Sequence, residues 1–253
     1  MLFVWCKVSF DEKRSHGSAV CETVYFFVEF VCVFPWKCVS LNNQNRGKIM
    51  DGILRKLPIG IQTFEKLREG DYLYVDKTAL VWRIASTETP YFLSRPRRFG
   101  KSLLLSTFEA YFEGKKELFE GLAIADMEKE WKTYPVFHLD LNAEKYDSPQ
   151  ALVEILSRQL TQWELKYGKG EDEETLSGRF AGVIRRASEQ ADRGVVVLVD
   201  EYDKPLLQAL DDGALLDDYR KTLKAFYGVL KSSDRYLRFV FLTGVTKFAQ
   251  VSV

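Results

Sequence analysis

The strongest constraint on the fold comes from five consecutive apolar residues, Val195–Val199, four of which are valine. β-Branched side chains favour strands, and an uninterrupted apolar run indicates a strand that is buried on both faces. Strands of this kind occur in parallel sheets that are covered by helices on both sides. Two acidic residues, Asp200 and Glu201, follow the run directly.

The rest of the chain alternates between short apolar runs and longer amphipathic segments. Three more strands are predicted at Tyr91–Ser94, Val136–Leu141 and Phe239–Leu242. Apolar residues at helical spacing, together with start and stop signals, predict helices at Ile61–Arg68, Lys77–Ala85, Lys101–Glu113, Pro149–Gly168, Thr175–Asp192 and Leu215–Lys231. This alternation of strand and helix predicts an α/β sandwich with a mainly parallel sheet.

The predicted strand Tyr91–Ser94 leads through a basic loop directly into a helix. We call this loop the GKS loop; its residues are Arg95, Pro96, Arg97, Arg98, Phe99, Gly100, Lys101 and Ser102. Gly100 allows the backbone to pass close to a phosphate group, and the start of the helix offers free amides and the positive end of its dipole. Lys101 would reach the β- and γ-phosphates of a nucleotide, and the Ser102 hydroxyl would coordinate Mg²⁺. The general pattern GxxxxGK[ST] is broken at its first glycine, which is Arg95 here. The alternative is a basic helix start with solvated arginines.

The two acids after the valine run suit the other half of a nucleotide site. Asp200 would hold Mg²⁺ and Glu201 would orient the attacking water. Two carboxylates at the end of a buried strand are costly unless a cation lies nearby, although the strand could also end in an ordinary polar turn. Thr243 ends the fourth predicted strand, where it could sense the γ-phosphate or simply begin a turn.

Two further polar residues have simpler interpretations. Asp203 is predicted to cap the helix that follows it, and the alternative is an acid that supports the site from behind. His138 lies within a predicted strand and is predicted to be a packed core residue rather than a catalyst.

Charge and composition limit the possible partners. The chain has 36 Lys and Arg residues and 36 Asp and Glu residues, so it lacks the basic excess typical of proteins that bind nucleic acid through phosphates. The apolar run Val24–Trp36 contains Glu29 and is shorter than the roughly 20 residues that a membrane-spanning helix needs. We therefore expect neither nucleic acid nor membrane as a partner. All four cysteines precede residue 39, and a body without cysteine favours a reducing cytoplasm.

The first 49 residues differ in character from the rest. Met50 is one of three methionines, and the regular pattern begins directly after it. The codons of Arg46-Gly47 can form a purine-rich ribosome-binding sequence just upstream. We therefore expect residues 1–49 to be a leader translated from a misplaced start, disordered or poorly packed, and residues 50–253 to be the folded domain. A genuine disordered or membrane-associated leader is the alternative.

Five motifs carry a resemblance to a known family. They are Leu57–Phe64, Tyr74–Thr78, Phe92–Ser102, Val199–Pro205 and Phe241–Phe248. They look like the AAA-ATPase-like domain proteins that are abundant in anaerobic bacteria, and the run RPRRFGKS is specific to that family. The departure at Arg95 is shared with the family.

The resemblance implies a P-loop NTPase (AAA-like) three-layer sandwich in the bacterial cytoplasm that binds ATP and Mg²⁺ and, when complete, hydrolyses ATP. Members usually continue into a lid and a nuclease domain similar to restriction endonucleases, whereas this chain stops at Val253, soon after the fourth core strand. We therefore expect a domain that is incomplete at its C-terminus, with self-association or a nuclease-type domain as possible partnerships. The alternatives are a non-catalytic, nucleotide-binding regulatory module and a non-functional gene fragment.

Overall fold

The computed structural model describes residues 2–8, 26–32, 55–87, 89–142 and 145–246. Near the N-terminus, strands β1 (Leu2–Val8) and β2 (Phe26–Cys32) pair antiparallel as a separate two-stranded sheet. The other residues of the expected leader lie outside the described part of the chain, and its assignment as a leader stays a prediction.

The main sheet consists of four parallel strands in the order β3-β6-β5-β4. Their bounds are Tyr91–Ser94 for β3, Val136–Asp140 for β4, Val195–Asp200 for β5 and Leu237–Gly244 for β6. All four strands coincide with predicted ones, and the expected parallel sheet is confirmed. The last strand, β6, lies between β3 and β5, so segments distant in the sequence become neighbours.

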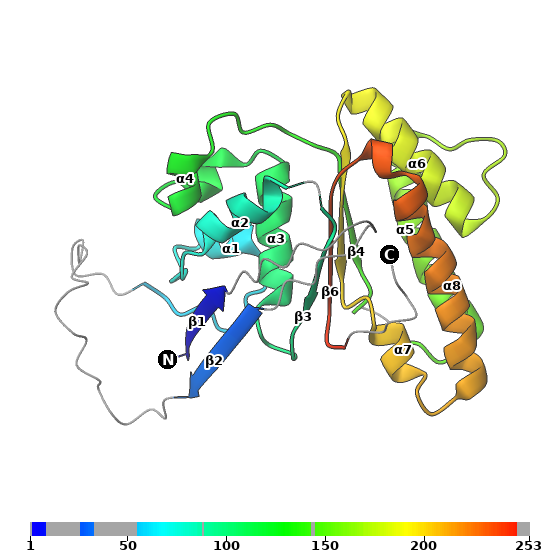
Figure 1. The fold of residues 1–253 in the computed structure, drawn as a ribbon, viewed down its shortest axis with the longest axis horizontal. Helices are drawn as coiled ribbons and strands as arrows, with labels where there is room; N and C mark the ends of the chain where they lie inside the picture. The colour runs from blue at the N-terminus through cyan, green and yellow to red at the C-terminus, as the bar shows by residue number, and fades with distance from the viewer. Residues whose placement is uncertain (1, 9–25, 33–54, 88, 143–144, 247–253) are drawn as a thin grey trace, which may run out of the picture.

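Helices cover both faces of this sheet (Figure 1). On one side lie α1 (Phe64–Glu69), α2 (Thr78–Ala85), α3 (Lys101–Phe112) and α4 (Ala123–Met127), and on the other α5 (Pro149–Tyr167), α6 (Leu176–Ala191) and α8 (Gly213–Ser232). The short helix α7 (Lys204–Gln208) follows β5, and two 3₁₀ turns, η1 (Lys116–Phe119) and η2 (Asp234–Tyr236), complete the list. The six longer helices match predicted ones to within a few residues. The helix α4 and both 3₁₀ turns were not predicted, because such short segments carry no periodic signal.

The alternation of side chains along β5 explains why its sequence is apolar throughout. Val195, Val197 and Val199 pack into the core formed with α5, α6 and α8. Val196 and Leu198 point to the opposite face and join the core formed with α3. Because successive residues of a strand face opposite sides, a strand covered by helices on both sides needs apolar residues at every position.

A parallel sheet gathers the carboxyl ends of its strands at one edge, where ligands bind in open α/β folds. At this edge β3 runs into the GKS loop, β5 ends at Asp200, and β6 ends with Thr243 and Gly244. The strand order places Thr243 between the other two. The fold thus assembles all the residues that the sequence nominated for a nucleotide site on one side of the sheet.

Candidate functional site

The GKS loop joins β3 to α3 through an unusual backbone. Arg98 has φ of 67° and Gly100 has φ of 76°, both in the left-handed region. Glycine adopts this conformation freely, whereas a non-glycine residue there costs on the order of 1–3 kcal/mol. Lys101 and Ser102 then begin α3, whose first amides have no partner within the helix. The loop therefore presents a helix start and two left-handed residues at the carboxyl edge of the sheet.

Lys101 is almost completely buried beneath its own loop. Its ammonium group donates to the carbonyl oxygens of Arg95 at 3.1 Å and Pro96 at 3.4 Å. It also forms an ion pair with Glu201 Oε1 at 3.0 Å, with only 3% of the Lys101 side chain exposed. These contacts join the GKS loop to the end of β5.

The acid pair that ends β5, Asp200 and Glu201, has a different environment at each residue. Asp200 is buried, and its Oδ1 accepts a 2.5 Å hydrogen bond from the Thr243 hydroxyl. Glu201 has φ of 52°, a left-handed conformation that turns the chain sharply after the strand. The structure therefore brings Lys101, Asp200, Glu201 and Thr243 together as a connected group. Whether Thr243 senses a phosphate stays a prediction; it does contact one of the two acids.

The remaining residues of the GKS loop are more open to solvent. Pro96, Arg97 and Arg98 are exposed, and Arg95, Phe99 and Ser102 are partly buried. Within the described part of the chain, neither Arg97 nor Arg98 forms a hydrogen bond or ion pair. Two cationic side chains are thus available beside a helix start, which is an arrangement that attracts anions.

Two acidic residues near this edge were not nominated for the site by sequence reasoning. Asp140 ends β4 directly beside Asp200, and its position at the carboxyl end of a predicted strand was the signal that could have found it. Asp203 is fully buried, and the predicted helix cap is wrong: Asp203 occupies the N-cap position of α7, but its side chain makes no capping hydrogen bond. Its carboxylate instead binds the chain after β6.

His138 lies on β4, and its environment is more polar than the predicted core packing. Its Nδ1 lies 2.9 Å from Glu109 Oε2 on α3, with 27% of the side chain exposed. Burial acts to lower the pKa of His138, but the hydrogen bond to Glu109 and the negative charges of Glu109, Asp200 and Asp140 outweigh it, so that the pKa is raised. The protonated imidazole therefore links the helix that follows the GKS loop to the sheet.

This raised pKa predicts a pH-dependent contribution to stability. A group whose pKa is higher in the folded state stabilises fully below its unfolded pKa, which is about 6.5 for histidine. The contribution disappears as the pH rises through the raised folded pKa. We expect the difference in free energy of unfolding between the parent chain and His138→Gln to be largest below about pH 6.5 and to shrink at alkaline pH. Denaturant unfolding at several pH values measures it, and a difference that grows with pH would contradict the assignment.

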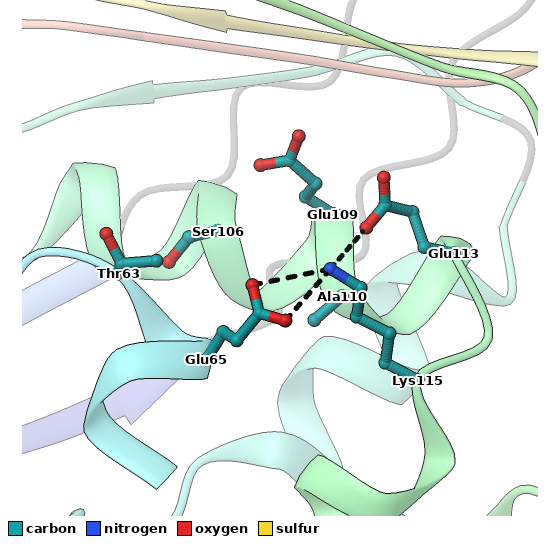
Figure 2. Close-up of a pocket in the computed structure, with 7 residues that line it drawn as sticks. All are labelled: Thr63, Glu65, Ser106, Glu109, Ala110, Glu113 and Lys115. Atoms are coloured by element: carbon teal, nitrogen blue, oxygen red, sulfur yellow. Dashed lines mark hydrogen bonds and ion pairs between the residues drawn. The ribbon is translucent and has the colours of Figure 1, made fainter. Parts of the chain in front are cut away.

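A separate hollow lies between α1 and α3 (Figure 2). Its volume is about 190 Å³, and its lining residues are Thr63, Glu65, Ser106, Glu109, Ala110, Glu113 and Lys115. The Lys115 ammonium lies 3.0 Å from Glu113 and 3.2 Å from Glu65, and these hydrogen bonds, that to Glu113 first, raise the pKa of Lys115. The lysine thus offsets much of the negative charge, and the lining includes no residue of the GKS loop or of the acid pair.

Within the described residues, no helix combines the length and apolar character that a membrane crossing requires. The same residues contain no group of three or more His, Cys, Asp or Glu side chains placed to hold a metal ion. Mg²⁺ in phosphoryl-transfer sites is usually held by one or two protein ligands together with the phosphates of the substrate.

The parallel sheet flanked by helices, with a loop and helix start after β3 beside an acidic strand end, defines a P-loop NTPase-like α/β protein. Residues 58–253 match the family described as "Predicted AAA-ATPase". The chain belongs to this family, and it therefore contains an ATPase-like domain.

One similar protein among the curated relatives comes from Azotobacter chroococcum mcd 1 and is called "Uncharacterized protein in vnfD 5'region". It is 42% identical over 200 residues, which cover 79% of this chain and 39% of the relative. The chain thus spans about two fifths of that protein's length. No solved structure shows a significant match to the chain.

Proposed function

We propose that the chain binds ATP together with Mg²⁺ at the GKS loop and hydrolyses the terminal phosphate with the help of the acid pair. The observation that carries this proposal is the meeting of Lys101 with Glu201 beside Asp200 and Thr243. A buried lysine at a helix start, aligned with two acids on a parallel strand, is the arrangement that triphosphate chemistry requires.

The residues present fit such a ligand. Lys101 already contacts backbone carbonyls and a carboxylate, all of them negatively polarised, so a phosphate oxygen can replace them as its partner. A side-chain carbon built at Gly100 would meet no atom within 4 Å, so the space at the helix start is open. Arg97 and Arg98 add exposed positive charge to the same loop.

The Lys101–Glu201 ion pair gives the site two states. Without nucleotide, Lys101 and Glu201 neutralise each other at 3.0 Å. When a phosphate takes over the ammonium group, Glu201 loses this partner and its carboxylate can orient a water molecule and accept its proton. Asp200 and the Ser102 hydroxyl are the residues that would hold Mg²⁺, which supplies positive charge to the developing phosphate charge.

Asp200→Asn tests the metal role. The asparagine oxygen can still accept from Thr243, so the local structure is retained while the negative charge is lost. We expect the affinity for ATP in the presence of Mg²⁺ to fall about tenfold or more, as for a lost charged interaction, and the affinity without Mg²⁺ to change little. Isothermal calorimetry of the full chain with and without Mg²⁺ provides the measurement.

The exposed residue Asp211 supplies the matched control, because Asp211→Asn removes the same charge away from the site. If Asp200→Asn and the parent chain bind Mg²⁺ and ATP equally well, Asp200 is not a metal ligand. Binding by the parent chain without any phosphate release would favour the non-catalytic regulatory module over the enzyme.

A further inference from the structure

Asp203 is a completely buried carboxylate that the proposed chemistry does not use. One of its oxygens, Oδ2, accepts three hydrogen bonds: from the amides of Val245 at 2.9 Å and Thr246 at 2.6 Å, and from the Thr246 hydroxyl at 2.8 Å. Its other oxygen, Oδ1, is buried without a hydrogen-bond partner. Concentrating three donors on one ionised oxygen makes a strong local attachment. The carboxylate thus holds the chain that leaves β6.

The chain held by Asp203 also contacts the start of the GKS loop. We call residues Gly244–Thr246 the β6 turn. The Gly244 carbonyl accepts from the amide of Arg95 at 3.0 Å, and the Val245 carbonyl accepts from the Ser94 hydroxyl at 2.8 Å. The β6 turn is therefore bonded on one side to Asp203 and on the other to the first residue of the GKS loop.

Tyr202 reinforces the first of these two sides. Its amide donates to the Thr243 carbonyl at 2.9 Å, and its hydroxyl donates to the Thr246 carbonyl at 3.0 Å. The packing at Gly244 leaves no room for adjustment: an added side-chain carbon would lie 2.6 Å from the Tyr202 ring and 2.7 Å from Asp203 Oδ1. Close-packed contacts of this kind transmit a displacement to their neighbours.

We propose that Asp203 is a positioning residue, which fixes the β6 turn and through it the start of the GKS loop and Thr243. This inference rests on the proposed function only for its consequence in nucleotide binding. Asp203 acts as a hydrogen-bond acceptor and contacts neither nucleotide nor metal. Its neutral isostere, asparagine, is therefore sufficient: the amide oxygen can face the three donors, and the NH₂ group takes the place of Oδ1.

The test compares Asp203→Ala, Asp203→Asn and a matched control in the full chain. Asp212 provides the control because its side chain also accepts two backbone amides, those of Ala214 and Leu215, but at the start of α8. Amide hydrogen exchange is followed at Arg95, which Asp203 does not touch. In Asp203→Ala we expect the Arg95 amide to exchange about tenfold faster or more, the equivalent of about 1.4 kcal/mol of lost protection.

The two comparison variants separate positioning from general destabilisation and from charge. Asp212→Ala should leave Arg95 exchange unchanged even where it lowers the melting temperature. Asp203→Asn should keep Arg95 exchange within about threefold of the parent chain, since it keeps an acceptor. Unchanged Arg95 exchange in Asp203→Ala overturns the proposal, and so does equal damage by the asparagine and alanine variants.

If Asp203→Ala does not fold, Thr246→Val removes a single donor to the same carboxylate. We then expect a smaller acceleration at Arg95, about threefold, and no acceleration would overturn the proposal. The consequence for binding is measured separately: Asp203→Ala should weaken ATP binding about tenfold below its melting temperature, while Asp203→Asn should not. A parent chain that binds no ATP would refute the proposed function, whereas the exchange measurements would still decide the role of Asp203.

Discussion

Glu201→Gln is expected to bind ATP but to hydrolyse it about 100-fold more slowly or worse, the range for a lost general base. Glutamine keeps the shape of the side chain but cannot accept a proton from water. It also breaks the ion pair that occupies Lys101 in the ligand-free chain. The affinity for ATP should therefore not fall, because the lysine becomes easier to recruit.

The measurement combines phosphate release at saturating ATP with calorimetric binding of ATP and Mg²⁺. Glu154→Gln is the matched control, since Glu154 is an exposed residue of α5 remote from the acid pair. Hydrolysis by Glu201→Gln at the parent rate would exclude Glu201 as the group that activates water. Asp140, which lies beside Asp200 at the same edge of the sheet, would then be the next residue to test.

Lys101→Ala is expected to lower the affinity for ATP with Mg²⁺ at least about tenfold, because a charge-assisted hydrogen bond to phosphate is worth roughly 1.5–3 kcal/mol. Two effects act in opposite directions on the free chain. The variant loses contacts to Arg95, Pro96 and Glu201 that hold the GKS loop closed. It also leaves the Glu201 carboxylate without its cation at a mostly buried position, which is destabilising.

The melting temperature therefore has to be measured together with the affinity, and binding is compared well below the lower transition. Lys224→Ala provides the control, since Lys224 is exposed on α8. If Lys101→Ala binds ATP as tightly as the parent chain, the GKS loop is not the phosphate site. A fall in affinity with unchanged folding would support it.

The two variants report on the same ion pair from opposite ends. Glu201→Gln releases the lysine and leaves binding intact, whereas Lys101→Ala releases the glutamate and removes binding. The difference arises because the lysine interacts with the bound substrate, while the glutamate acts mainly in the transition state. Equal losses of affinity in both variants would indicate that the pair serves only to stabilise the fold.

The sequence by itself determined the type of fold and most of its elements. The valine run predicted a doubly buried strand, because only helices on both faces can cover apolar side chains that alternate in direction. The order of strand, glycine-containing loop and helix at residues 91–113 predicted the helix start at Lys101, because left-handed backbone and free amides depend on local residues. These signals are carried by neighbours in the chain, and they could therefore be read without coordinates.

Only the tertiary structure decided which residues meet at the edge of the sheet. The placement of β6 between β3 and β5 brings Thr243 against Asp200, and no local pattern specifies strand order. Asp203 lies at the N-cap position of α7, where capping was the local expectation, yet its carboxylate binds the amides of Val245 and Thr246. Three donors from a neighbouring strand end outcompete the amides of a short helix, because a buried carboxylate is stabilised by the number and closeness of the hydrogen bonds it accepts. That competition depends on which segments the fold brings side by side.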